Sequence, residues 1–343
     1  MKKLLNTLYI LSEDAYLALD GENVVAWKDK TIAGRIPLHT LTSIVCFSYK
    51  GASPALMGEC ASRGLDLVFF SPRGRFLART SGMNKGSLLL QKRQYEICSD
   101  EKLCCEIARN MLLGKVFNAR WVIERAKRDH PLQVDLERLK ARSQELARYL
   151  DELKMTDDLG ALRGIEGAAA RSYFDVFNEL ILTDRGEFHF EDRSRRPPTD
   201  KVNAMLSFGY SLLSSDYASA LEGVGLDSRS GFLHADRPGR SSLALDMVEE
   251  LRSAFVDRVV LSAINKRIVG PADFDVYQDG AVLLNEKGRK AFLEVWQAKK
   301  KDVIRHPYLG EKIEWGLVPH VQSLLLARYI RGDIDGYPPF LWK

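Results

Sequence analysis

The sequence predicts an α+β fold with two domains, a small β-sandwich-like domain at the N-terminus and a larger all-α domain after it. Before residue 82, short runs of β-prone residues alternate with turn residues. After Met83, apolar residues recur every three or four positions among good helix formers. The length of 343 residues also suits two domains of ordinary size.

Turn signals between β-prone runs define the first domain, residues 1–82. Asp20–Asn23 joins two short runs as a hairpin turn does, and Pro72–Arg75 separates two later runs in the same way. A single helix is expected at Pro54–Arg63, because Gly64 follows it as a C-cap. The expected strands cover residues 4–11, 16–19, 24–27, 44–47, 65–70 and 76–79.

Helical spacing dominates the rest of the chain. Residues 83–95 are interpreted as a linker and helix start, and residues 96–343 as the helical catalytic domain. Ser99 or Asp100 is suited to cap the helix that follows. The tail around residues 336–339 is expected to be irregular. The expected helices cover residues 88–97, 101–127, 134–154, 163–182, 201–221, 241–268, 286–303 and 314–331.

Composition excludes several classes of protein. Fifty Lys and Arg residues against 46 Asp and Glu give a net charge of +4, which permits a nucleic-acid partner without requiring one. The five cysteines form no CxxC pair, which argues against a disulfide framework or a zinc ribbon. The N-terminal apolar stretch is broken by Asn6 and stopped by Glu13, so it does not resemble a signal peptide. With no apolar run of about 18 residues, the chain is expected to be cytoplasmic and to have no membrane partner.

The segment Ser230–Arg252 gathers a histidine and several acids. Asp246 and Glu249 lie about 60° apart on one helix face, and His234 precedes them in a loop that can fold back. Such a set of ligands suits Mg²⁺ or Mn²⁺ in phosphoryl transfer. The ordinary interpretation is a solvated acidic face and a structural histidine. Helix geometry alone leaves Glu249 and Glu250 equally suitable.

Two further segments carry candidate residues. Glu166 stands alone among Gly, Ile and Ala residues near a helix start, where it either interacts with the helix dipole or, if partly buried, needs a partner such as a metal. Arg193, Arg195 and Arg196 precede Pro197-Pro198 and form a stiff basic loop suited to phosphate contacts. The alternative is a surface loop leading into a helix capped by Asp200. Arg240 is the basic candidate in the histidine segment.

Together these segments resemble a known family. In order they read Gly-x-Glu-Gly-x-x-Ala-x-x-Tyr-Phe, Arg-Arg-Pro-Pro-x-Asp before an Asn-bearing helix, Gly-x-Gly-Leu-Asp, Gly-Phe-Leu-His and Ser-Leu-Ala-x-Asp-x-x-Glu-Glu. This set resembles the CRISPR-associated endonuclease and integrase of the spacer-acquisition machinery. One departure is Lys201, where a proline is common. The matching segments are residues 164–174, 195–203, 223–227, 231–234 and 242–250.

The resemblance assigns roles to the candidates. It implies that Glu166, His234 and Glu249 are the metal ligands and that Asp246 is a further functional acid beside the metal. It therefore favours Glu249 over Glu250. It also implies that a metal ion, Mg²⁺ or Mn²⁺, supports joining of the 3′-hydroxyl ends of a short DNA duplex to the repeat of a CRISPR array, and DNA cleavage.

The resemblance also implies partners. Family members are homodimers paired through their β-rich domains, and they act with a small ferredoxin-like second CRISPR-associated protein on double-stranded DNA. The carboxy-terminal region suggests subtype I-C, in which a separate iron–sulfur nuclease trims the incoming DNA.

Two other functions fit parts of the pattern. A non-catalytic nucleic-acid-binding scaffold would need the basic loops but not the acids. A helical metallohydrolase acting on a small phosphorylated molecule would need the acids but not Arg195 and Arg196. The family resemblance disfavours both.

Overall fold

The computed structural model describes residues 6–80, 88–195 and 197–343. The chain divides into two compact units, Met1–Lys85 and Gly86–Lys343. Most of the strands belong to the first unit, and the second is largely helical. The expected α+β class is therefore confirmed.

The first unit contains two sheets. A four-stranded sheet has the order β1 (Thr7–Ile10), β5 (Ser43–Cys46), β6 (Asp66–Phe70), β7 (Phe76–Arg79). Its first two pairings are parallel and its last is antiparallel. The parallel pair β5 and β6 needs a crossover, which α1 (Pro54–Arg63) provides.

The second sheet is an antiparallel meander of β2 (Tyr16–Asp20), β3 (Asn23–Lys28) and β4 (Thr31–Pro37). Both predicted turns are confirmed, since Asp20 pairs with Asn23 and Gly74, at φ 79°, turns the chain from β6 into β7. Strand β4 was not predicted, and its residues are mostly exposed with no alternating burial.

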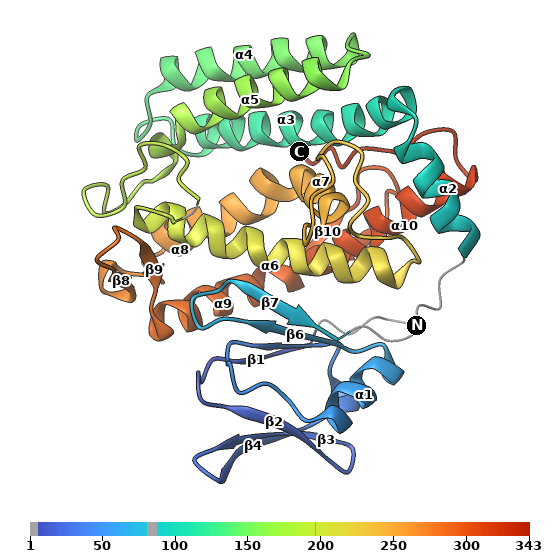
Figure 1. Ribbon diagram of the computed structural model, residues 1–343. Coiled ribbons are helices and arrows are strands. Elements are labelled where there is room, and N and C mark those ends of the chain that lie inside the picture. The colour runs from blue at the N-terminus through green and yellow to red at the C-terminus, as the bar shows by residue number, and fades with distance from the viewer. Residues whose placement is uncertain (1–5, 81–87, 196) are drawn as a thin grey trace. The chain divides into compact units, whose positions relative to one another are not determined.

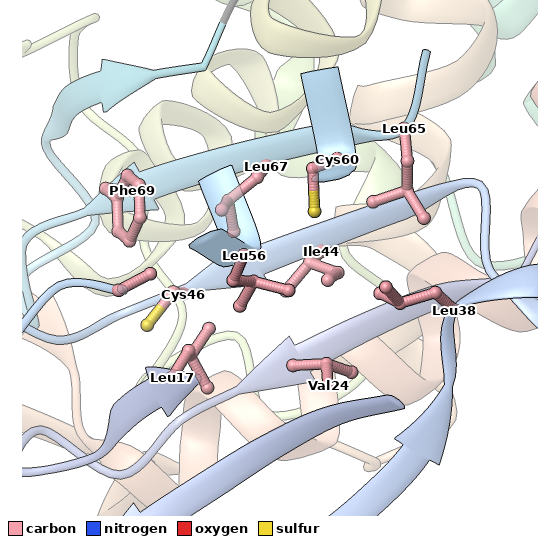
Figure 2. Packing of buried hydrophobic residues seen from close by; sticks show 11 residues of the cluster. Leu17, Val24, Leu38, Ile44, Cys46, Leu56, Cys60, Leu65, Leu67 and Phe69 are labelled. Carbon is pink, nitrogen blue, oxygen red and sulfur yellow. The ribbon is translucent and has the colours of Figure 1, made fainter. Parts of the chain in front are cut away.

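An apolar core lies between these sheets and α1. Ser53 caps α1 by accepting from the backbone N–H of Leu56, and Gly64 ends it at φ 66° as predicted. Figure 2 shows side chains from both sheets directed toward those of α1. Packing from three sides explains why strands this short are stable. The labelled core residues are Leu17, Val24, Leu38, Ile44, Cys46, Leu56, Cys60, Leu65, Leu67 and Phe69.

Helix α3 is the central element of the second unit. It contacts α4 and α5 and also α7 (Figure 1). Asp100 caps α3, accepting from the N–H groups of Lys102 and Leu103, so the predicted cap is Asp100 rather than Ser99. The helices are α2 (Leu88–Cys98), α3 (Glu101–Asp129), α4 (Leu136–Lys154), α5 (Leu159–Asp175), α6 (Lys201–Gly223), α7 (Ser242–Leu251), α8 (Arg258–Asn265), α9 (Glu286–Lys301) and α10 (Val318–Arg331).

Two features of this unit differ from the expectation. The single helix expected over residues 241–268 is divided into α7 and α8 by a π-helical turn at Arg252–Asp257. Two short hairpins interrupt the helices, so the unit is not wholly α. The helix expected over residues 88–97 is present as α2, and residues 83–87 of the expected linker and helix start lie outside the described residues. The hairpins are β8 (Phe274–Val276) with β9 (Val282–Leu284), and β10 (Val303–Arg305) with β11 (Lys312–Glu314).

All five cysteines are free thiols, as their spacing predicted. Burial raises the pKa of Cys46 and of Cys60 to about 11, so these thiols stay protonated and act as small apolar core residues. In the part of the chain that the structure describes, no helix has the length and apolarity needed to cross a membrane.

Candidate active site

His234 and Asp246 form a tight pair at the start of α7. His234 Nδ1 lies 2.5 Å from Asp246 Oδ1. The Asp246 carboxylate is fully buried and accepts three backbone N–H groups, from Phe232 at 2.7 Å, Leu233 at 3.0 Å and His234 at 3.0 Å. Asp246 thus fixes both the loop and the imidazole. When Nδ1 of His234 carries the proton and donates it to Asp246, Nε2 keeps its lone pair for a ligand.

Gly231 permits this wrapping of the loop around the carboxylate. A Cβ at this position would lie 2.8 Å from Asp246 Oδ2 and 2.9 Å from the Ser242 backbone. Arg163 holds the loop from the other side, donating from Nη2 to the Leu233 carbonyl at 2.7 Å. Any side chain at Gly231 would therefore separate the loop from α7.

A second cluster lies where α3, α5 and α7 meet. Lys115 on α3 places its ammonium between two carboxylates. It pairs with Glu166 Oε1 of α5 and lies 2.6 Å from Glu249 Oε2 of α7. Two predicted acids, 83 residues apart in sequence, therefore converge on one cation.

Arg252 adds a second positive charge. Its Nη2 lies 2.9 Å from Glu249 Oε1, and its guanidinium stacks over the Tyr210 ring at 4.7 Å. Burial favours the neutral acid, but Arg252, Lys115 and His234 outweigh it and lower the pKa of Glu249 to about 2. Glu249 therefore stays ionised, as a cation ligand must.

Glu250 points away from this cluster. Its carboxylate is fully buried and accepts from the Tyr337 hydroxyl at 2.5 Å and from the Phe340 N–H at 3.0 Å. Burial raises its pKa to about 7, although Tyr337, Phe340 and Gln322 act in the opposite direction. Of the two acids that periodicity could not separate, the one that faces Glu166 is Glu249.

The sequence of the chain matches a known family. The profile described as "CRISPR associated protein Cas1" matches residues 8–298, which is most of the chain. The chain belongs to the Cas1 family.

Two Cas1 relatives match over their full length. The chain is 48% identical to CRISPR-associated endonuclease Cas1 1 of Chlorobaculum tepidum over 343 residues, covering all of both chains. It is 47% identical to CRISPR-associated endonuclease Cas1 2 of Rhodospirillum rubrum, again over 100% of each.

Solved structures with this fold include one titled "Casposase bound to integration product". It matches with a TM-score of 0.84 and 21% identity, over 98% of this chain and 93% of that one. A "Cas6-RT-Cas1--Cas2 complex" matches with a TM-score of 0.83 and 20% identity, over all of this chain and 36% of that one. A Geobacter sulfurreducens protein named as a Cas4 exonuclease/Cas1 endonuclease fusion is 32% identical over 98% of this chain and 60% of its own length.

The donor set of this Cas1 chain fits a hard divalent cation. Within the described residues, no three Asp, Glu, His or Cys side chains lie close enough together to hold an ion as they stand. However, the Lys115 ammonium already sits between Glu166 and Glu249, where two carboxylates gather around positive charge. With the free nitrogen of His234, these groups offer the oxygen and imidazole ligands that Mg²⁺ and Mn²⁺ accept.

A pocket borders the two-carboxylate cluster. Lys115, Glu166 and Arg252 form its charged wall. Arg195 lines the same pocket, so one of the predicted basic residues shares this pocket with Glu166. Ser253 and Asp257 also line the pocket. The rest of its wall is aromatic and apolar and includes Tyr173, Phe174, Tyr210, Ala169, Ala170 and Leu146.

The other predicted arginines differ in their surroundings. Arg193 is turned inward, donating to Asn203 Oδ1 at 2.6 Å and Ser207 Oγ at 3.1 Å, and burial lowers its pKa. It braces its loop, which makes it a poor DNA contact. Arg240 is half-buried in the loop before α7. Arg196 lies outside the described residues.

Sequence reasoning missed Lys115, Arg252 and Arg163. Lys115 carried one usable signal, a lysine set among the buried positions Gly114, Val116 and Asn118 of α3. Arg252 follows Glu249 by three residues, the spacing of neighbours on a helix. Neither feature of the sequence predicts which distant carboxylate the cationic side chain pairs with.

Proposed function

We propose that this Cas1 chain is a metal-dependent DNA endonuclease and integrase. In this proposal it joins the 3′-hydroxyl ends of short duplexes, new spacers, into the repeat of a CRISPR array. The convergence of Glu166 and Glu249 on one cation is the observation that carries it, and Asp246, which binds His234, lies on the same helix as Glu249. Support comes from relatives named as endonucleases and from the likeness to a casposase bound to an integration product.

Glu166, His234 and Glu249 would hold the ion, Mg²⁺ or Mn²⁺. When bound, it would supply charge neutralisation at the scissile phosphate and at the leaving oxygen. Asp246 serves indirectly, because it fixes the imidazole of His234 through Nδ1. Arg252 keeps Glu249 ionised, and Lys115 balances the two carboxylates.

The reaction is a single phosphoryl transfer without a covalent enzyme intermediate. A DNA 3′-hydroxyl loses its proton to solvent as its oxygen attacks phosphorus in the target strand. The bond from that phosphorus to the target's own 3′-oxygen breaks, and the expelled oxygen gains a proton from solvent. Water as the nucleophile gives cleavage instead. Cations near the site, such as Arg195 in the pocket that Glu166 lines, would hold the DNA backbone.

The partners are proposed on the same grounds. We propose a homodimer formed through the β-rich unit, bound to a small ferredoxin-like second CRISPR-associated protein and acting in the cytoplasm. The fold likeness to a Cas1–Cas2 assembly supports the second protein. The Cas4 fusion in a relative supports an iron–sulfur nuclease of the adaptation complex, as the proposed subtype I-C would use.

A strand-transfer assay tests the proposal. The chain, with and without its small partner, is mixed with a short labelled duplex, a repeat-containing plasmid and Mn²⁺ or Mg²⁺. Label should enter the plasmid only with metal, and Glu166→Ala and His234→Ala should each abolish joining. His130→Ala is the matched control, because His130 ends α3 outside the site.

Two outcomes would overturn it. Joining that survives His234→Ala would mean that the ligand set is wrong. Wild-type chain that binds DNA but neither cuts nor joins it with any divalent metal would favour the non-catalytic scaffold.

A further inference from the structure

The C-terminal segment Tyr337–Trp342 is folded against α7 on the side to which Glu250 points. Figure 1 shows the end of the chain, marked C, next to α3 and α7. The Tyr337 hydroxyl and the Phe340 N–H donate to opposite oxygens of Glu250. Gln322 of α10 also donates to Glu250 Oε2, at 3.1 Å, and to the Tyr337 hydroxyl, at 2.8 Å. The Glu250 carboxylate thus joins the tail and α10 to α7.

Asn118 ties the same segment to α3. Its Nδ2 donates to the Glu250 carbonyl at 2.7 Å and to the Phe340 carbonyl at 2.8 Å. Its Oδ1 accepts the Trp342 N–H at 2.9 Å. One fully buried side chain therefore bonds α7 and the tail at the same point.

The residues that make these bonds lie within one helical turn of the residues of the site. Asn118 follows Lys115 by three residues on α3, and Glu250 follows Glu249 directly on α7. The π-helical turn begins at Arg252, so regular α-helical bonding ends next to Glu249. Asn118 thus donates to the Glu250 carbonyl where the regular α-helix gives way to the π-helical turn.

Aromatic contacts hold the segment in place. Trp342 lies between two guanidinium groups, with Arg125 at 4.1 Å and Arg258 at 4.6 Å from the ring centroid. Phe340 is fully buried and packs edge-on against His306 and Trp315. A segment anchored at both Tyr337 and Trp342 is well placed to fix the rotation of α7.

Gly114 permits the close approach of α3 to α7 at this level. A Cβ there would lie 3.0 Å from Glu250 Oε1. The Glu250 side chain therefore packs directly against the α3 backbone while it binds the tail, and a shift of one of these elements is transmitted to the others.

We propose that Tyr337–Trp342 is a positioning element of the active site, with Tyr337 and Asn118 as positioning residues that hold Glu249 and Lys115 toward Glu166. The inference rests on the proposed function, because it concerns the alignment of the proposed metal ligands. A rotation of α7 by one residue, about 100°, would bring Glu250 toward Lys115 and carry Glu249 away from it. The hydrogen bonds of Glu250 oppose that rotation.

Calorimetric titration of the full chain with Mn²⁺ tests the proposal, alongside kcat and KM for DNA joining and the unfolding temperature. Tyr337→Phe removes only the hydroxyl, and Asn118→Ala removes both tail bonds and the carbonyl bond. We expect Mn²⁺ affinity to fall about threefold to tenfold in the first variant and about 10–100-fold in the second. In both, kcat should fall while KM for DNA is unchanged. Tyr308→Phe is the matched control, since Tyr308 is exposed.

The outcomes separate this inference from the proposed function. Wild type that neither binds Mn²⁺ nor joins DNA would defeat the proposed function, and the inference with it. Wild type that does both, beside variants with lowered unfolding temperature but unchanged Mn²⁺ affinity and kcat, would leave the proposed function intact and reduce the tail to a structural role.

Discussion

Glu249 and Glu250 are neighbours on α7, both buried, yet they behave as opposites. Glu249 faces Lys115 and Arg252, and its pKa falls to about 2. Glu250 faces the uncharged donors Tyr337 and Gln322, and its pKa rises to about 7. Because burial disfavours the ionised form of both, the difference comes from the charge of their partners.

Glu249 thus has the surroundings of a ligand for a cation, and Glu250 has those of a structural residue. Cations around Glu249 keep an anion available, and a divalent ion can replace part of that positive charge. Neutral donors around Glu250 hold a carboxyl group in a fixed place without preparing it for a ligand. Four predictions sharpen or break this distinction, beginning with the largest effect.

Glu249→Gln should lower DNA joining by about 10²-fold or more, because the neutral amide is a poor ligand and leaves Lys115 and Arg252 unbalanced. Glu250→Gln should lower it by about tenfold or less. The strand-transfer assay with Mn²⁺ measures both. Equal losses in the two variants would show that the neighbouring acids do not have separate roles.

Lys115→Met should lower the metal-free unfolding free energy by about 3 kcal/mol, because it leaves two largely buried carboxylates without their shared cation. Mn²⁺ should then raise the unfolding temperature more than it does in wild type. Thermal unfolding with and without Mn²⁺ measures this, and Lys102→Met on the exposed side of α3 is the control. A variant that metal stabilises no more than wild type would contradict the shared cation position.

Asp257, in the π-helical turn, is a buried acid whose pKa is raised, as that of Glu250 is. It predicts that the stability of the fold depends on pH. It is buried and accepts from the Tyr210 hydroxyl at 2.5 Å. Burial raises its pKa from 3.8 to about 6, although Tyr210, Tyr173 and nearby arginines act in the opposite direction. Since the folded pKa exceeds the unfolded one, its contribution to stability is complete below pH 3.8 and is lost as pH rises through about 6.

Asp257→Asn should therefore gain stability relative to wild type as pH rises from about 4 to 7, by up to about 3 kcal/mol. Urea unfolding of both proteins across that range measures the difference. A constant difference at every pH would mean that Asp257 titrates as it does in the unfolded chain.

Arg195→Ala and Arg240→Ala should have the smallest effects. Each is expected to weaken duplex binding about threefold to tenfold and to reduce the salt dependence of binding by about one ion. Arg138→Ala is the control, because Arg138 is already paired with Asp175 and Glu179. The measurement is the duplex affinity at several salt concentrations. An unchanged slope of log affinity against log salt in both variants would show that neither arginine contacts DNA.

Much of the fold was predictable because local patterns determine it. Turn residues at Asp20–Asn23 and Pro72–Arg75 mark two hairpins, and Asp100 starts the long helix α3. Helical periodicity predicts most helices to within a few residues. The strand β4 and the π-helical turn at Arg252–Asp257 were missed, because neither has a local period of its own.

The sequence by itself determined the two-domain α+β class, the spacing of Asp246 and Glu249, and, through the order of its motifs, the candidates Glu166 and His234. Only the tertiary structure decided that Lys115 would lie between Glu166 and Glu249, and that the tail would bind Glu250. Periodicity and turn chemistry act between residues close in sequence, so they specify elements and faces. The partner of a buried charge depends on which distant elements pack together, and only the folded chain brings those elements into contact.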